Sequence, residues 1–355
     1  MIRRRFLLSG LAAIAAPYVH AGSTSPEFSS RAIDLVAQSN VIDMLGLLTL
    51  NYRLLVRWQE APQNFGEADF CKLRESGINV FNPAVAFPTE NPYQVTHDWL
   101  TRWNFFLGQH PAFFLRIDAP DDLANAKKQG KIGIILGMQD ADHLRNVDDV
   151  DAFYQLGQRV TQLTYNATNR LGSGCLGHDT GLTPFGAEVV SRMNEIGMAV
   201  DVSHCGERTS LDAIEASDAP VLITHSNCRA LCPEIARCKS DETIKAAARK
   251  GGVIGITSVR HFVRAKDPVT IEDALDHFDH AVKVAGIEHV GVGSDMDLDG
   301  RDRPAGPALY DIAGLNRTGR IYELTEGLIR RGYSDADIAL ILGGNFERAL
   351  GEIWT

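Results

Sequence analysis

Short hydrophobic runs alternate with amphipathic segments along most of the chain. Runs such as 132–137 and 253–257 consist almost entirely of apolar residues and glycine, which is typical of strands covered on both faces. Segments such as 185–196 and 241–250 carry apolar residues at helical spacing. The repeated strand–helix units favour an α/β fold, specifically a (β/α)8 TIM-type barrel, over a doubly wound sheet. The predicted barrel strands are 40–44, 78–82, 132–137, 160–164, 199–203, 221–224, 253–257 and 290–294.

One further run, Phe113–Arg116, does not fit this set of strands, and we assign it to an accessory segment. No linker-like stretch and no internal repeat interrupts the pattern. The sequence therefore predicts one barrel domain over residues 22–355.

The N-terminus has a different composition. Arg3, Arg4 and Arg5 precede a short apolar stretch, and small residues follow up to Ala21, as in bacterial export signals. Residues 3–7 resemble the twin-arginine pattern, although an ordinary secretory signal with a chance arginine pair is the alternative. The stretch is too short to span a bilayer, and no later stretch is long enough. We expect residues 1–21 to be removed on export by the twin-arginine machinery, leaving a soluble periplasmic protein.

The overall composition is that of an ordinary globular protein, with 45% hydrophobic and 23% charged residues among 355. Lys and Arg total 35 against 45 Asp and Glu, a net charge of −10. This acidic balance argues against binding to a phosphate backbone, so nucleic acid is not an expected partner. Homodimers are common among soluble enzymes, but one chain does not reveal an interface.

Polar residues lie where the predicted strands end, which is where barrels of this type keep their catalytic groups. His204 and His225 end consecutive strands, which lie about 5 Å apart in a sheet, so both rings can reach one metal ion. Asp295 ends the last strand, and Gln139 and Tyr165 follow two earlier ones. Any one histidine alone could be structural, but the combination predicts metal-assisted hydrolysis.

Seven short motifs stand out in the chain: Gly181–Gly186, Met193–Met198, Asp201–His204, Ala219–Asn227, Gly251–Gly255, Gly291–Asp295 and Gly343–Phe346. They resemble motifs of the membrane (renal) dipeptidase family of zinc peptidases. The similarity runs from about residue 42 to the C-terminus and is dense after residue 156. The resemblance implies a metallo-dependent hydrolase barrel that uses two zinc ions to cleave dipeptides.

The resemblance also implies roles for individual residues. His204 and His225 match the two histidines of the second zinc site, and Asp295 matches the carboxylate that shuttles a proton from water to the leaving amine. Arg237 resembles the arginine that binds the substrate carboxylate, a task suited to a planar guanidinium. That match needs a one-residue insertion, so Arg229 is a rival, and a surface ion pair is the other interpretation of Arg237. Tyr165 is assigned to substrate binding.

The chain departs from the family at the first metal site. Leu45 and Leu47 occupy the positions of its histidine and aspartate ligands, and Gln139 replaces the bridging glutamate. Tyr165 also stands where the family has a histidine. A neutral amide cannot compensate two cations as a carboxylate does. We therefore expect a divergent bacterial member with at most one zinc ion on His204 and His225, and with Gln139, Asp295 or Asp43 as third ligand.

Two functions follow from these residues. The first is a periplasmic hydrolase that cleaves a dipeptide or similar small amide with one metal-activated water. The second is an inactive dipeptidase-like barrel that binds a small peptide or helps it mature. The lost ligands favour the second function, whereas the retention of His204, His225 and Asp295 together favours the first.

The six cysteines form an even set, which permits disulfides in an oxidising compartment. Cys228, Cys232 and Cys238 are close in sequence, but no Cys-x-x-Cys pair supports a metal cluster. The sequence leaves two interpretations open, one local bridge or buried free thiols. The other cysteines are Cys71, Cys175 and Cys205.

Overall fold

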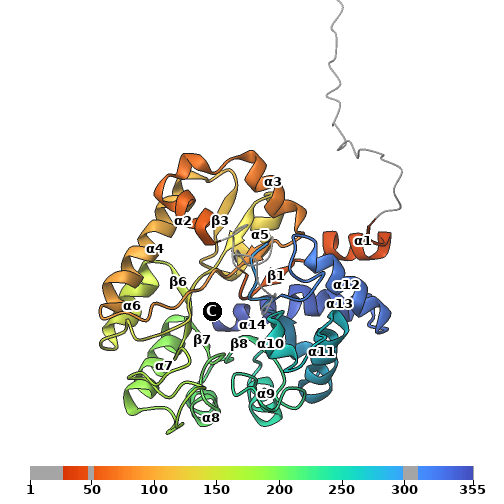
Figure 1. The fold of residues 1–355 in the computed structure, drawn as a ribbon. Coiled ribbons are helices and arrows are strands. Elements are labelled where there is room, and N and C mark those ends of the chain that lie inside the picture. The colour runs from red at the N-terminus through yellow and green to blue at the C-terminus, as the bar shows by residue number, and fades with distance from the viewer. Residues whose placement is uncertain (1–26, 47–51, 299–310, 355) are drawn as a thin grey trace, which may run out of the picture.

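The computed structural model describes residues 27–46, 52–298 and 311–354. The predicted export signal and Leu47 lie outside these residues. In Figure 1 the strands surround a central axis and the helices form an outer ring around them. The predicted (β/α)8 barrel is therefore confirmed.

Parallel strands form two sheets that together make the ring. One sheet has the order β3-β4-β2-β1-β10-β9-β8 and the other β5-β6-β7. A bridge between Asp201 and Leu222 joins β7 to the segment that leads into β8, and a bridge between Val85 and Met138 joins β5 to the segment after β2. The strands are β1 (Ile42–Asp43), β2 (Val80–Phe81), β3 (Phe114–Arg116), β4 (Ile132–Ile134), β5 (Leu136–Met138), β6 (Gln158–Gln162), β7 (Ala199–Asp201), β8 (Ile223–Ser226), β9 (Ile254–Ile256) and β10 (Val290–Val292).

Each of the eight predicted runs contains or overlaps a strand of this ring. The run 132–137 is split at Ile135 into β4 and β5, which pair with different neighbours. The accessory run is itself a strand, β3, which pairs with β4 at the end of the larger sheet. The sequence pattern thus located the strands, and backbone pairing decided which of them close the ring.

The helices are amphipathic and pack their apolar sides on the strands. Thr183 caps α7 by accepting the Gly186 N–H, and Gly197 ends it with a φ of 75°. The helices are α1 (Ser30–Gln38), α2 (Tyr52–Glu60), α3 (Glu67–Glu75), α4 (Pro92–Gln109), α5 (Pro120–Lys128), α6 (Asp148–Gln155), α7 (Pro184–Ile196), α8 (Glu207–Ala216), α9 (Asp241–Arg249), α10 (Arg260–Val263), α11 (Ile271–Ala285), α12 (Arg320–Arg330), α13 (Asp335–Ala339) and α14 (Asn345–Ile353), with short helical turns at Pro62–Asn64, Ile287–His289 and Leu340–Gly344.

The last helix closes one end of the barrel. Phe346, Leu350 and Ile353 of α14 pack in one buried cluster with residues at the beginnings of the strands, among them Ile42 and Val80. In Figure 1 α14 lies near the centre of the ring. Because this cluster seals the amino ends of the strands, the carboxyl ends are the open face of the barrel.

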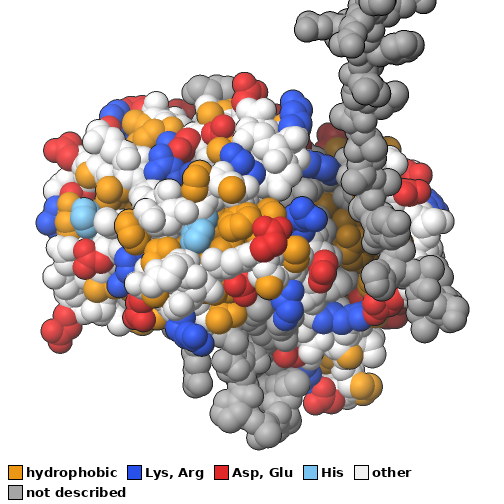
Figure 2. Space-filling model, turned by 90° about the horizontal axis from the view of Figure 1, so that it is seen from above, with side chains coloured by type: hydrophobic (Ala, Val, Ile, Leu, Met, Phe, Trp, Pro, Cys, Tyr) orange, Lys and Arg blue, Asp and Glu red, His pale blue; other side chains and the backbone are white. Residues whose placement is uncertain are grey.

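The surface carries charges of both signs. On the face shown in Figure 2, Lys and Arg side chains lie between Asp and Glu side chains and hydrophobic ones, and they do not gather into one patch. Within the described residues, no helix is long and apolar enough to cross a membrane.

Candidate active site

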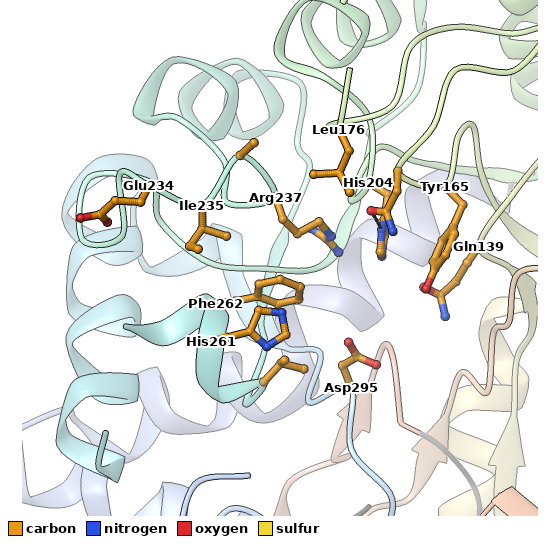
Figure 3. A pocket seen from close by; sticks show the side chains of 13 residues that line it. Gln139, Tyr165, Leu176, His204, Glu234, Ile235, Arg237, His261, Phe262 and Asp295 are labelled. Atoms are coloured by element: carbon orange, nitrogen blue, oxygen red, sulfur yellow. Dashed lines mark hydrogen bonds between the residues drawn. The ribbon is translucent and has the colours of Figure 1, made fainter. Parts of the chain in front are cut away.

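A cavity of about 580 Å³ opens at the carboxyl ends of the strands. It brings together five of the six residues that the sequence predicted for the site: Gln139, Tyr165, His204, Arg237 and Asp295. Figure 3 shows that Arg237, His204 and Asp295 point toward the same space from different elements. The other lining residues are Asn166, Leu176, Glu234, Ile235, Ala236, Val259, His261 and Phe262.

The sixth residue, His225, is fully buried directly behind His204. The two Nε2 atoms face each other at 2.9 Å, and the ring of Tyr165 stacks on the other side of His204 with centroids 4.4 Å apart. The convergence predicted from two consecutive strand ends is thus present in the structure.

Both imidazoles are held through their Nδ1 atoms. Nδ1 of His204 lies 2.7 Å from Oδ1 of Asn166, and Nδ1 of His225 lies 2.9 Å from Oγ1 of Thr224. Thr224 in turn donates to Asp201 at 2.6 Å, so its oxygen accepts from His225. The 2.9 Å contact between the Nε2 atoms is a hydrogen bond, in which one of the two nitrogens donates. A proton on each Nδ1 would instead leave both Nε2 lone pairs available to a metal ion, which is the tautomer that a metal ligand needs.

Burial and nearby positive charge favour the neutral form of His204. Burial, followed by the charge of Arg237, lowers the pKa of His204 well below its usual value. Neutral imidazole is the form that binds metal ions.

Two glycines allow β9 and the segment after β10 to approach β8, which carries His225. A Cβ atom at Gly255 or at Gly293 would collide with the backbone oxygen of Thr224. Only glycine therefore permits β9 and the end of β10 to pack this tightly against β8, which brings Asp295 to the histidines.

Asp295 and Asn166 both adopt left-handed backbone conformations, with φ values of 55° and 61°. Non-glycine residues rarely do so, and such strained positions gather at functional sites. The Asp295 N–H donates to Leu45 O at 2.6 Å, which anchors the turn that aims this carboxylate into the cavity.

Arg237 is buried, with 3% of its surface exposed, so the surface ion pair considered for it is wrong. Its terminal nitrogens donate to Ser226 Oγ at 3.2 Å and to His225 O at 2.6 Å. Nε is buried and has no hydrogen-bond partner among the described residues. Burial lowers the pKa of Arg237, but a guanidinium keeps its charge at neutral pH.

The rival residue, Arg229, is occupied elsewhere. It pairs with Glu207 at 2.9 Å and lines a different surface hollow. Of the two arginines, Arg237 is the one that faces the candidate site.

The first metal site of the family does not fit these residues. Leu45 is fully buried at the position of the histidine ligand, and Gln139 donates its amide to Ala84 O at 2.9 Å. Asp43 is excluded as a ligand because Ser294 and Arg320 bind its carboxylate oxygens. No group of three or more His, Cys, Asp or Glu side chains in the described part of the chain could hold a metal ion.

The histidine pair could supply two ligands to a single ion, because the Nε2 atoms converge and both rings are anchored at Nδ1. Gln139 and Asp295 line the same cavity. As placed, Asp295 does not form a metal-binding group with the two histidines, which leaves the amide oxygen of Gln139 as the other candidate third ligand. Zinc in catalytic sites usually has three protein ligands, so one of these oxygens is required.

Sequence reasoning missed Asn166, Thr224 and Asp201, which orient the histidines. Asp201 is 2% exposed and accepts hydrogen bonds from the backbone and side chains of Ser203 and Thr224. The sequence did contain a signal for Asp201 and Thr224. Asp201 lies in an apolar strand, and a buried carboxylate there requires hydrogen-bond donors nearby. Asn166 follows Tyr165 directly, and asparagine tolerates the left-handed conformation.

Comparison with known proteins identifies the family. The model for membrane dipeptidase, peptidase family M19, matches residues 29–355. An uncharacterized dipeptidase of Schizosaccharomyces pombe is 36% identical over 234 residues, which cover 60% of this chain and 54% of the relative. The dipeptidase tcpJ of Claviceps purpurea is 30% identical over 239 residues, covering 66% and 54%. The matches thus span about half the length of these two relatives.

Solved structures agree in fold. An amidohydrolase from Pseudomonas aeruginosa has a TM-score of 0.79 and 28% identity, covering 91% of this chain and 99% of that one. The probable dipeptidase PvdM from the same organism has a TM-score of 0.75 and 22% identity, covering 91% and 97%. Because the family model matches nearly the whole chain and the motifs at the strand ends agree with it, this chain belongs to the membrane dipeptidase family.

Proposed function

We propose that this chain is a periplasmic hydrolase that cleaves a dipeptide or similar small amide with one metal-activated water. The observation that carries the proposal is the pair His204–His225, with Nε2 atoms 2.9 Å apart and each Nδ1 on an acceptor. A barrel that only bound peptides would not need two buried imidazoles preorganised in this way.

The substrate carboxylate binds Arg237. Its Nε and the remaining protons of its terminal nitrogens form a planar set of donors that can bind a carboxylate. The Cζ atom of Arg237 lies 5.5 Å from the centroid of the Phe262 ring. The Phe262 ring excludes water from this side of the guanidinium, which strengthens the hydrogen bonds between Arg237 and a substrate carboxylate. Tyr165 borders the same space and provides a wall for the bound peptide.

His204 and His225 would hold the ion, and Gln139 or Asp295 would supply the third ligand. When bound there, zinc supplies a Lewis acid that polarises the scissile carbonyl and lowers the pKa of a water molecule. Asp295 takes the proton from the attacking water and passes it to the leaving amine.

Metal content per chain tests this proposal first. The protein is prepared without a polyhistidine tag, dialysed, offered zinc and analysed for elements, and a dipeptide panel is then assayed with the same sample. We expect about one zinc per chain, as for a mononuclear catalytic site. His204→Ala and His225→Ala should lose both the zinc and the hydrolysis.

The alternative is a barrel that binds a small peptide or assists its maturation without cleaving it. The neutral side chains Leu45 and Gln139 at former ligand positions favour it. Absence of bound zinc after zinc is offered, together with peptide binding that depends on Arg237, would establish the alternative and overturn the hydrolase.

The periplasmic location is tested separately. Replacement of Arg3 and Arg4 by lysine should leave the precursor in the cytoplasm if the twin-arginine machinery exports it. Continued export of that variant would indicate an ordinary secretory signal.

A further inference from the structure

The loop between β8 and α9 carries Arg237 and is bounded by two cysteines. Cys232 and Cys238 enclose Pro233–Arg237, and four residues of this segment line the candidate active site. Both thiols are buried, at 1% and 0% exposure. The function proposed above does not use either of them.

The two thiols lie side by side under α10. Sγ of Cys238 is 3.3 Å from the carbonyl oxygen of Phe262, and Sγ of Cys232 is 4.0 Å from that of His261. Each thiol thus donates to one of two consecutive carbonyls of α10, which places the two side chains at neighbouring points of one helix. Two successive turns also join the cysteines, because the Ile235 N–H donates to Cys232 O at 3.1 Å and the Cys238 N–H donates to Ile235 O at 3.0 Å. The chain thus folds back between them and brings both sulfur atoms to the same helix, which favours bond formation between this pair.

The other cysteines have different partners. Cys228 donates to His277 O at 3.5 Å, Cys205 accepts from Thr164 at 3.3 Å, and Cys175 donates to Asn166 at 3.4 Å. Cys71 lies on α3, where it contacts Glu67. Among the described cysteines, Cys232 and Cys238 are therefore the pair that we expect to form a disulfide.

We propose that Cys232 and Cys238 form a disulfide bridge under oxidising conditions, which closes the loop that carries Arg237. The sequence left one local bridge or buried thiols open, and the side-by-side placement of these two sulfurs favours the bridge. The bridge fixes both ends of the segment that presents Arg237 and Ile235 to the cavity.

The oxidant is an organic disulfide, for which oxidised glutathione is the probe. The Cys232 thiolate attacks one glutathione sulfur and displaces the other as a thiolate. Cys238 loses its proton and attacks Sγ of Cys232 in the mixed disulfide, releasing the second glutathione. Both cysteine hydrogens are thus transferred to glutathione, which is reduced to two thiols.

The neighbouring Cys238 thiol lowers the pKa of Cys232, while the Cys232 thiol, together with burial, raises the pKa of Cys238. Because the thiolate is the attacking species, Cys232 reacts first and Cys238 resolves the mixed disulfide.

Peptide mapping tests the bridge on the full chain. Reduced protein is refolded with oxidised and reduced glutathione, unfolded in denaturant with excess iodoacetamide and digested with trypsin. Cleavage after Arg229, Arg237 and Lys239 separates residues 230–237 from residues 238–239, with one cysteine in each. We expect these two peptides linked, at a mass about 2 Da below their reduced sum, and the other cysteines alkylated.

Cys228→Ser is the matched control, because it removes a buried neighbouring cysteine outside the pair and should retain the linked peptides. Cys238→Ser should leave Cys232 alkylated. Alkylation of both Cys232 and Cys238 in the wild-type protein, or linkage of Cys232 to Cys228, would overturn the proposal. The wild-type map decides by itself, even if a variant fails to fold.

Thermal unfolding gives a second measurement, independent of enzymatic activity. Reductant should lower the unfolding midpoint of the oxidised wild-type protein by about 4 °C, because the bridge restricts the unfolded loop. The same reductant should not shift Cys238→Ser. An equal shift in both proteins would show that the stabilisation comes from elsewhere.

Discussion

The guanidinium of Arg320 donates a hydrogen bond to Oδ2 of Asp43 over 3.1 Å, although 277 residues separate them in the chain. Both side chains are buried, at 1% and 0% exposure. Asp43 also accepts the N–H of Ser294 at 2.8 Å, and Arg320 donates to Asp297 O at 3.1 Å. This ion pair thus joins the first strand, the last strand and α12, directly beside the turn that presents Asp295.

Arg320→Met should lower the free energy of unfolding by about 3–5 kcal/mol, because it leaves the buried Asp43 carboxylate without its counterion. Urea unfolding followed by circular dichroism measures the loss. Arg31→Met is the matched control, since Arg31 pairs with Asp335 at the exposed surface, and it should cost no more than about 1 kcal/mol. Equal losses in the two variants would contradict a structural role for the buried pair.

Thr224→Val should weaken zinc binding by about 10- to 100-fold while the fold persists. The substitution preserves the shape of the side chain but removes the oxygen that is hydrogen-bonded to Nδ1 of His225. Competition with a chromophoric zinc chelator measures the affinity, and circular dichroism checks the fold. Unchanged zinc affinity would mean that Thr224 does not orient the ligand.

Arg237→Lys should raise KM for a dipeptide more than it lowers kcat, because lysine keeps the charge but loses the planar fork. A dipeptide with an amidated C-terminus lacks the carboxylate and provides the control, so it should respond much less to the substitution. A similar loss for both substrates would place Arg237 outside carboxylate binding.

Asp295→Asn should retain zinc and fold but lose turnover, by about 10²–10⁴-fold, since the amide cannot accept the proton of the attacking water. Metal analysis and steady-state kinetics on one preparation separate the two effects. Loss of zinc in this variant would assign Asp295 as the third ligand, and retained turnover would remove it from proton transfer.

Asp140→Asn should stabilise the protein at neutral pH. Burial raises the pKa of Asp140 to about 6 from 3.8, so between these values the folded chain binds more protons at this site than the unfolded chain. The free energy of unfolding of the wild-type protein therefore falls as pH rises through this range, whereas the variant lacks this contribution.

Asparagine has nearly the same shape as aspartate. Its single amide oxygen can accept both hydrogen bonds that Oδ1 of Asp140 accepts, from the Asn169 side chain and from the backbone N–H of Asp142. Unfolding in urea at pH 4 and pH 7 measures the difference between the two proteins. We expect a larger difference at pH 7, and a difference that does not change with pH would show that the carboxyl titrates normally.

The apolar runs of the sequence predict the strands and place His204, His225 and Asp295 at their ends. These features depend on local patterns, since a buried parallel strand reads as an apolar run and the barrel places every strand end on one face. The motifs also pointed to the family, and the two leucines and the glutamine predict a change at its first metal site.

Residues with the same local sequence signal were distinguished by their packing in the folded barrel. Arg229 and Arg237 lie in one loop, but packing buries Arg237 at the cavity and pairs Arg229 with Glu207. Asp43 was a candidate ligand until Arg320, distant in sequence, was seen to bind its carboxylate. Such outcomes depend on contacts between distant segments, and these contacts form only when the closed ring brings the ends of all its strands together.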